Sequence, residues 1–222
     1  MMYRLAIAST VLALGACAGP HGHHHDHEGK KGMGMGMGMK DKTMSFFITS
    51  TNPGKGADLG GLAGADAHCA ALAESAGVKG KNWKAYLSSS KENARDRIGK
   101  GPWVNAKGVV VATSVDNLHS DQNNLTKANS LDEKGMVVNG RGDAPNRHDV
   151  MTASNAQGML EGGTCNDWTS SGEGSILVGH HDRVGGGAAP TSWNAAHPSR
   201  GCGMEALKAT GGDGLYYCFA AN

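Results

Sequence analysis

The sequence predicts an α+β domain, held together by disulfides and preceded by a disordered N-terminal tether. One stretch near the start of the domain has the three- and four-residue spacing of a helix, whereas several later stretches have the short apolar pattern of strands. The chain is 39% hydrophobic but only 5% aromatic and contains 35 glycines, which indicates a modest core with many turns. Four cysteines follow the tether, and a loop-rich domain of this kind gains stability from covalent links.

Residues 1–16 have the composition of a secretory signal. Arg4 precedes an apolar run over residues 5–14, which is too short to span a membrane. The following Leu14-Gly15-Ala16-Cys17 resembles the lipobox of bacterial lipoproteins, in which the cysteine becomes the lipidated first residue. The resemblance implies export, lipidation at Cys17, and a lipid anchor in the bacterial cell envelope, at the outer membrane on its periplasmic or surface side. The alternative is an ordinary signal with a chance cysteine.

Residues 17–44 form a low-complexity segment that we expect to be a disordered tether. Glycine at every second place of its methionine block costs too much chain entropy for ordered structure. Imidazoles suit zinc, nickel and copper, whereas thioethers favour cuprous copper, so the tether could hold Cu, Zn or Ni. The alternative is a solvated spacer of biased composition. The candidate ligands are His21, His23, His24, His25, His27, Met33, Met35, Met37 and Met39.

The folded domain is expected to occupy residues 45–222, a length that fits one domain. Residues 46–50 read as a first strand, which ends at the turn formers of residues 52–54. Apolar residues and Cys69 then recur with helical spacing from Leu62 to Ala76, and Gly77 supplies a stop. This helix should bury Cys69.

The middle of the domain should contain a strand, a hairpin and a short helix. Trp83, Ala85 and Leu87 alternate with polar residues, as in a half-buried strand. Residues 103–104 and 109–112 flank a turn-forming tetrapeptide and predict a hairpin. Ser114 is placed to cap a short helix that ends at Leu118.

The pattern of apolar and polar residues weakens after the predicted short helix. Residues 121–163 show no clear periodicity and are expected to form loops. Residues 177–178 and 215–219 are the remaining strand candidates.

Several segments of the domain resemble one known family. Residues 60–69 and 83–90 resemble the opening of the collagen-derived endostatin domain and of related bacterial domains. The pairs and short motifs Val104-Asn105, Cys165-Asn166-Asp167-Trp168 and Leu215-Tyr216-Tyr217-Cys218 match the same family. The resemblance covers nearly all of residues 45–222 and implies a C-type lectin-like (endostatin-like) fold.

The four cysteines of the domain permit three pairings. The family resemblance implies two nested disulfides, Cys69 with Cys218 and Cys165 with Cys202. A cysteine metal site has little support, because none of these cysteines are two to four residues apart, as structural zinc sites usually need.

A calcium-dependent sugar site, known in many lectins of this fold, is not expected. Such sites resemble Glu-Pro-Asn or Gln-Pro-Asp followed by Trp-Asn-Asp, whereas this chain has Ala144-Pro145-Asn146 and the reordered Asn166-Asp167-Trp168. Calcium needs six to eight oxygen ligands, and the missing side chain removes one. A turn at Pro145 and a loop built with Asp167 and Trp168 is the favoured interpretation.

Two clusters remain as candidates for ligand or metal contact. His180-His181-Asp182 lies in the same disulfide loop as His197, although adjacent side chains of a strand point to opposite faces. Arg141-Gly142-Asp143 copies an integrin-recognition tripeptide, and a glycine turn between solvated charges is the favoured reading. The candidate ligand-binding residues are Asp143, Asn146, Asn166, Asp167, Trp168, His180, His181, Asp182 and His197.

The sequence favours binding over catalysis. It has no nucleophile elbow, no His-Glu-x-x-His motif and no phosphate-cradling glycine loop, so we expect no enzyme and no required cofactor. The formal net charge of +1, with no basic block in the domain, gives nucleic-acid binding no support. We therefore expect a lectin-like module that binds a carbohydrate or protein ligand through loops 143–152 and 165–202. The alternative is an exported Cu, Zn or Ni binding protein that acts through the tether.

Overall fold

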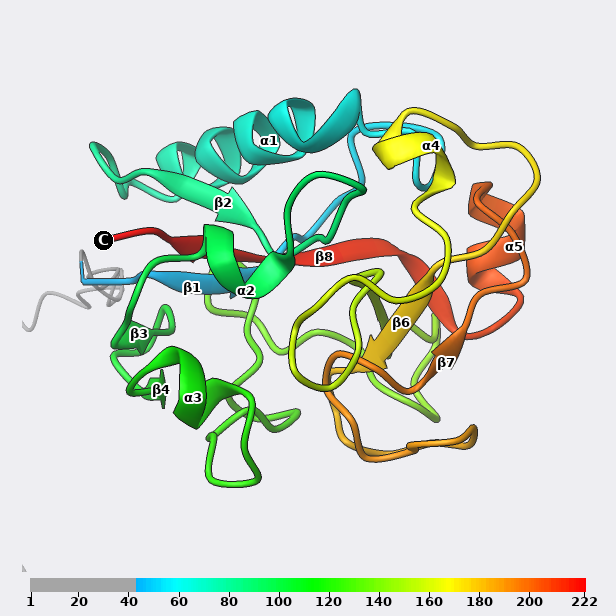
Figure 1. Cartoon of the computed structure of the whole chain (residues 1–222). Coiled ribbons are helices and arrows are strands. Elements are labelled where there is room, and N and C mark those ends of the chain that lie inside the picture. Colours follow the sequence, from blue (N-terminus) through cyan, green and yellow to red (C-terminus); the bar gives the residue numbers. More distant parts are fainter. Residues whose placement is uncertain (1–42) are drawn as a thin grey trace, which may run out of the picture. The chain divides into compact units, whose positions relative to one another are not determined.

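The computed structural model describes residues 43–222, so the signal segment, Cys17 and the metal-ligand candidates of the tether lie outside the described residues. The described part is mixed α+β, which confirms the predicted class (Figure 1). None of its helices is long and apolar enough to cross a membrane. Its elements are β1 (Phe46–Ile48), α1 (Gly61–Ser75), β2 (Trp83–Ala85), α2 (Ala94–Arg97), β3 (Trp103–Val104), β4 (Val110–Ala112), α3 (Val115–Leu118), β5 (Asp149–Met151), α4 (Cys165–Trp168), β6 (Leu177–His180), β7 (His197–Pro198), α5 (Met204–Lys208) and β8 (Gly212–Ala220).

Strand β8 is the centre of the main sheet in the described residues. The order is β1-β8-β5-β6-β7, and β2 also pairs with β8. The second half of β8 runs antiparallel to β1 and β2, whereas its first half runs parallel to β5. Strand β8 therefore connects the half of the domain that carries α1 with the half that carries β6 and β7 (Figure 1).

Helix α1 lies beside β2 (Figure 1), and a disulfide fastens it to the sheet. The predicted helix is confirmed, and Gly77 follows it with a φ of 85°, a conformation that glycine adopts at little cost. Cys69 is fully buried and is bonded to Cys218 in β8. The second predicted pair, Cys165 with Cys202, is also present.

The few aromatic residues gather around β8. Phe219 contacts Phe46 with ring centroids 5.0 Å apart and Trp103 with centroids 5.2 Å apart. Phe47 meets Trp83 edge-on, at 4.9 Å. All of these rings are buried, so a chain with only 5% aromatic residues still builds one dense core.

The predicted hairpin and capped helix are confirmed. Strands β3 and β4 pair antiparallel around the turn at residues 105–108. The Ser114 hydroxyl accepts a hydrogen bond of 3.1 Å from the backbone N–H of Asn117 in α3. This side-chain cap satisfies a donor that a helix of one turn cannot pair internally.

The region expected to form loops contains a strand that the sequence did not reveal. Residues 149–151 form β5, which is inserted between β8 and β6, so the expectation of loops throughout residues 121–163 is wrong at this place. The strand of residues 177–178 also extends to His180. Strand β7 and the short helices α2, α4 and α5 were not predicted either.

Candidate functional site

Three histidines and one aspartate meet at the end of β5 and β6. The Nε2 atoms of His148, His180 and His197 lie 3.1, 3.3 and 3.5 Å from one oxygen of Asp149, Oδ1. His148, Asp149 and His180 are buried, and the side chain of His197 is 20% exposed. We call these four residues the histidine cluster. It brings together the predicted candidates His180 and His197 with two residues that the sequence analysis missed.

The strand register explains why these side chains meet. Asp149 of β5 lies directly opposite His180 of β6, and His197 of β7 lies opposite Val178 of β6. Residues two apart on a strand share a face, and so do residues directly opposite each other. Asp149, His180 and His197 are therefore placed on one face of the sheet. His148 comes from the residue just before β5, and its ring stacks on that of His180 at 4.3 Å.

The backbone fixes the tautomer of each histidine. The Nδ1 atoms of His148, His180 and His197 lie 3.1, 2.7 and 3.0 Å from the carbonyl oxygens of Val184, Pro190 and Pro198, respectively. A carbonyl oxygen can only accept, so each Nδ1 must donate. In a neutral imidazole the lone pair is then on Nε2, which is the atom turned towards Asp149. This outer hydrogen bond is typical of histidines that bind a metal.

The inner atoms of His148, Asp149 and His180 are close enough to hold one metal ion, since one ligand atom from each lies within 4.8 Å of the others. With metal–nitrogen bonds of about 2.0 to 2.1 Å, two ligand atoms of tetrahedral zinc lie about 3.3 Å apart. Both carboxylate oxygens of Asp149 and Nε2 of His180 are buried without a hydrogen-bond partner among the described residues. Such unpaired buried acceptors are costly, and a cation held between them compensates that cost. His148, His180 and Asp149 therefore fit a divalent ion bound through two nitrogens and one oxygen, and His197 lies beside them with Nε2 3.5 Å from Asp149 Oδ1.

Asp182 supports the cluster from the outside. Its carboxylate accepts hydrogen bonds from the backbone N–H groups of Arg141 (2.6 Å) and Val184 (3.1 Å), and Oδ1 lies 3.6 Å from Nδ1 of His148. Burial alone would raise the pKa of Asp182, but His148 and the two N–H donors hold this pKa well below its usual range. Burial alone would also lower the pKa of His148, but Asp182 and Asp149 outweigh it and raise this pKa above the ordinary 6.5.

Glycines surround the imidazole rings at distances that no larger residue permits. A Cβ on Gly211 would lie 2.8 Å from Nε2 of His148, and one on Gly187 would lie 3.1 Å from Cβ of His197. A Cβ on Gly185 would overlap Nδ1 and Cε1 of His180. Gly185, Gly187 and Gly211 thus leave the space that the imidazole rings occupy.

Gly185→Ala is expected to weaken metal binding, because the new methyl group would push the His180 ring away from Asp149. The zinc dissociation constant should rise at least about tenfold, as for the loss of an outer partner. The matched control is Gly186→Ala, since a Cβ on Gly186 would meet nothing within 4 Å. Competition titration with a zinc chelator measures both variants. Equal affinities of the two variants would show that the tight packing on His180 does not matter.

The other predicted ligand residues are placed outside the cluster. Trp168 is fully buried, and its Nε1 donates to the carbonyl oxygen of Ser88 at 2.8 Å. The carboxylate of Asp167 accepts from the backbone and hydroxyl of Ser90, and Asn166 donates to Thr169 within the same turn. These three side chains therefore build the α4 turn.

Three further candidates lie near the cluster but not in it. His181 points to the opposite side from His180, with Nε2 3.0 Å from the carbonyl oxygen of Asn139, as expected for adjacent strand residues, and burial lowers the pKa of His181. Asp143 pairs with Lys127, which lowers the pKa of Asp143. Asn146 lines a cavity together with His148 and His197.

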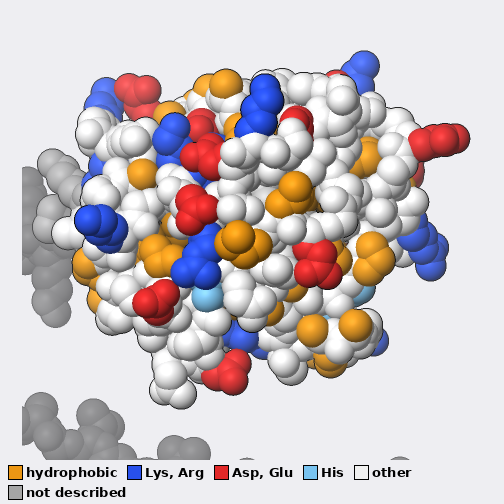
Figure 2. All heavy atoms as spheres, in the orientation of Figure 1, with side chains coloured by type: hydrophobic (Ala, Val, Ile, Leu, Met, Phe, Trp, Pro, Cys, Tyr) orange, Lys and Arg blue, Asp and Glu red, His pale blue; other side chains and the backbone are white. Residues whose placement is uncertain are grey.

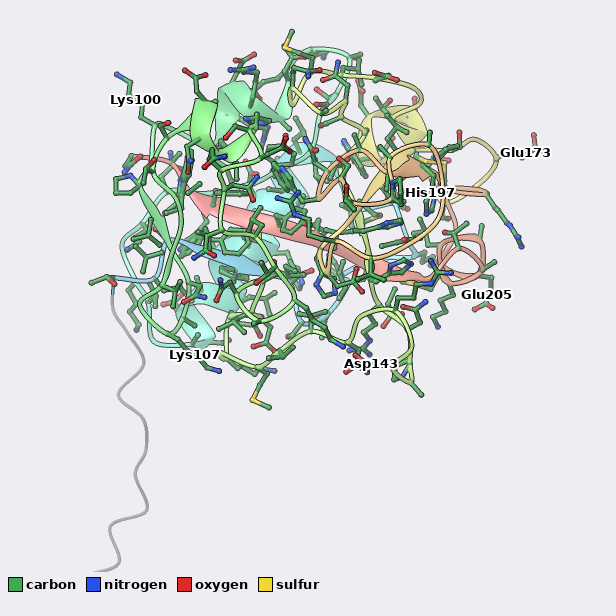
Figure 3. All side chains as sticks on the ribbon, turned by 90° about the horizontal axis from the view of Figure 1, so that it is seen from below. Lys100, Lys107, Asp143, Glu173, His197 and Glu205 are labelled. Atoms are coloured by element: carbon green, nitrogen blue, oxygen red, sulfur yellow. A yellow bond between two sulfur atoms is a disulfide. The ribbon has the colours of Figure 1, made fainter. Side chains whose placement is uncertain are left out.

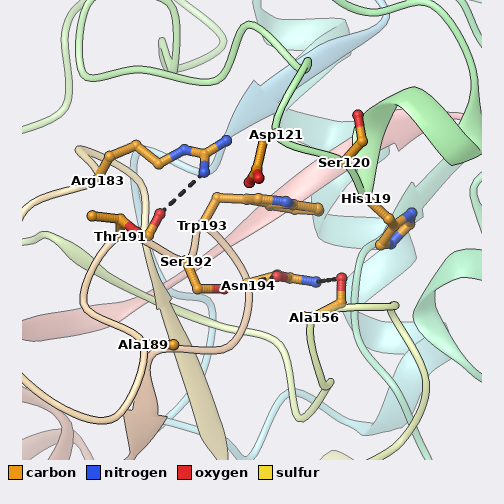
Figure 4. Close-up of a pocket in the computed structure, with 10 residues that line it drawn as sticks. All are labelled: His119, Ser120, Asp121, Ala156, Arg183, Ala189, Thr191, Ser192, Trp193 and Asn194. Carbon is orange, nitrogen blue, oxygen red and sulfur yellow. Dashed lines mark hydrogen bonds between the residues drawn. The ribbon is translucent and has the colours of Figure 1, made fainter.

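A second cavity, of about 180 Å³, lies beside Trp193 and is shown in Figure 4. Two of its polar side chains are paired: Arg183 donates to the carbonyl oxygen of Thr191 at 3.0 Å, and Asn194 donates to that of Ala156 at 3.3 Å. The Tyr86 hydroxyl lies 2.7 Å from Nε2 of His119, which also lines the cavity. No described residue of this lining has a buried polar side-chain atom without a partner, so the cavity is a weaker candidate than the histidine cluster.

No protein-family model matches the chain, and a search of curated proteins finds no match. The class of the site is therefore argued from its geometry, which is that of a candidate metal site formed by His148, Asp149 and His180 with His197 beside it.

Proposed function

We propose that this chain is an exported protein that binds a divalent transition metal within its folded domain. The observation that carries the proposal is the convergence of three Nε2 atoms on Asp149 Oδ1 at 3.1 to 3.5 Å. Each ring is held on its far side by a contact between Nδ1 and a backbone carbonyl oxygen. An arrangement that depends on the register of β5, β6 and β7 is more specific than a group of histidines on a surface.

Zinc is the ion that the donor set suits best. His148, His180 and Asp149 supply ligands of moderate softness, and His197 lies beside them as a fourth group, a donor set that zinc accepts readily in a tetrahedral arrangement. Divalent copper would bind the same atoms more tightly in a flexible site, but it prefers a square-planar or tetragonal arrangement. The ligands come from β5 to β7 and their flanks, so the packed sheet should hold the tetrahedral shape.

The remaining features of the proposal come from the sequence. We propose that the domain has a C-type lectin-like fold, that Cys17 carries the lipid anchor, and that loops of the domain meet a carbohydrate or protein ligand without catalysing a reaction. The two disulfides support an oxidising compartment. On the face shown in Figure 2, charged side chains of both signs are interspersed and apolar ones are scattered, which favours recognition at a defined site over a broad apolar surface.

A metal titration tests where the ion binds. Full-length protein and a shortened protein beginning at Thr43 are titrated with zinc, copper and nickel by calorimetry. We expect the shortened protein to retain one tight zinc site per chain, since the histidine cluster lies within the described residues. Any additional ions bound only by the full-length protein belong to the tether. Absence of tight binding by the shortened protein would contradict the proposal.

The same titration in mild acid provides a second check. The raised pKa of His148 means that a proton competes with the ion already above pH 6.5. Metal affinity should therefore fall as the pH drops through this pKa, by about tenfold per pH unit for each proton displaced. An affinity that does not change with pH would show that His148 is not a ligand.

A further inference from the structure

An open cavity of about 410 Å³ adjoins the histidine cluster. His148 and His197 form part of its wall, and so do the exposed residues Arg141 and Arg200. Asn146 is also in the wall, and the backbone N–H of His148 donates to its Oδ1, which leaves its amide nitrogen directed to other acceptors. The cavity is thus lined by hydrogen-bond donors beside the place where the ion would be held.

The two arginines are not committed to partners in the described part of the chain. No hydrogen bond or ion pair joins either guanidinium to another described residue. By contrast, the neighbouring Arg147 pairs with Asp213 at 2.9 Å. Guanidinium groups present several donors in a planar fork that matches carboxylates and phosphates. Two such groups on one cavity wall therefore offer a binding surface for an oxyanion.

The charges around the cavity lead to the same ligand class. A divalent ion brings two positive charges, which Asp149 and Asp182 balance when the histidines are neutral. No carboxylate is among the described residues that line the cavity. Arg141 and Arg200 then remain as positive charge without compensation, beside an ion that can accept a fifth ligand.

Building on the proposed metal function, we propose that the cavity binds an oxyanion, a phosphate or a carboxylate group, between Arg141, Arg200 and the bound ion. The anion enters from solvent through the open side of the cavity and contacts both guanidinium groups. The ion recruits the ligand, and the arginines select for its negative charge.

The test uses the full-length, zinc-loaded protein after removal of excess zinc, with inorganic phosphate and acetate as probes in calorimetry. We expect at least one anion to bind, and binding by the double variant Arg141→Ala/Arg200→Ala to be at least tenfold weaker at unchanged zinc affinity. Tighter binding of phosphate assigns the site to phosphate groups, and tighter binding of acetate assigns it to carboxylates. Lys107→Ala is the matched control, because it removes an exposed positive charge at the other end of the domain from His197 (Figure 3).

Asp149→Asn separates this inference from the proposed function, since it keeps the tether and both arginines but removes the carboxylate ligand. Equal zinc binding by this variant and by the wild type would overturn both proposals. Two results would overturn the oxyanion proposal alone. Either the wild type binds zinc normally but no anion, or its anion binding is not weakened in the double arginine variant. Equal anion binding by wild type and Asp149→Asn would also overturn it, because the ion would then play no part.

Discussion

Asp149→Asn is expected to remove the zinc-dependent stabilisation of the folded domain. Asp149 Oδ1 is the atom on which all three histidine Nε2 atoms converge, and an amide in its place supplies no negative charge. The zinc dissociation constant should rise at least about 100-fold, the upper end of the cost of losing an outer partner. Zinc at 100 times the wild-type dissociation constant stabilises the wild type by about 2.7 kcal/mol and should stabilise the variant by less than about 0.5 kcal/mol.

The metal-free proteins provide a second readout. The carboxylate of Asp149 is buried with both oxygens unpaired among the described residues. In alkaline buffer, where the histidines are neutral, the amide should therefore leave the metal-free domain as stable as before or more stable. Urea unfolding with and without zinc measures both effects, and Asp116→Asn, on an exposed ion pair, is the control. A large loss of stability without zinc would show that Asp149 has a structural role instead.

Cys69→Ala/Cys218→Ala is expected to cause the largest loss of folding stability among simple changes to this domain. The bond joins residues 149 positions apart and ties α1 to β8, the central strand. Closing a loop of that length is worth about 5 kcal/mol at most in the chain-entropy estimate. Domains commonly have only about 5 to 15 kcal/mol in total, so the variant should be marginally stable or unfolded at 37 °C.

The comparison variant is Cys165→Ala/Cys202→Ala, which opens a loop with a sequence separation of 37. Its expected loss is about 4 kcal/mol at most, smaller than for the long loop. Urea unfolding of oxidised wild type and both variants gives the two values. A loss below about 1 kcal/mol for the Cys69 and Cys218 pair would mean that packing around β8 holds the domain without the covalent link.

The sequence allowed the regular elements to be predicted where their patterns are local. The helix through Cys69, the hairpin at residues 103–112 and the Ser114 cap each depend on neighbouring residues, and all three are present. Strand β5 was not predicted, because three residues are too few to show the apolar–polar alternation of a strand. Its position is decided by pairing with β6 and β8, which are distant in the sequence.

The site could be predicted only in part, for the same reason. His180 and His197 were recognised as candidates because they share a disulfide loop and bear imidazoles. His148 and Asp149 were not, because nothing near them indicates that β5 lies next to β6. The available signal was the apolar pair Val150-Met151, which directly follows His148 and Asp149. A closer search for buried strands would have used this pair.

The Cys165–Cys202 bond encloses both His180 and His197, and this has a consequence for the order of events in biogenesis. In a reducing cytoplasm the bond stays open, and the two ligands would be held near each other only loosely. If the protein is exported and binds an ion in the histidine cluster, as we propose, it should leave that compartment without the ion and bind it only after oxidation. Export of the polypeptide would then not remove metal ions from the cytoplasm.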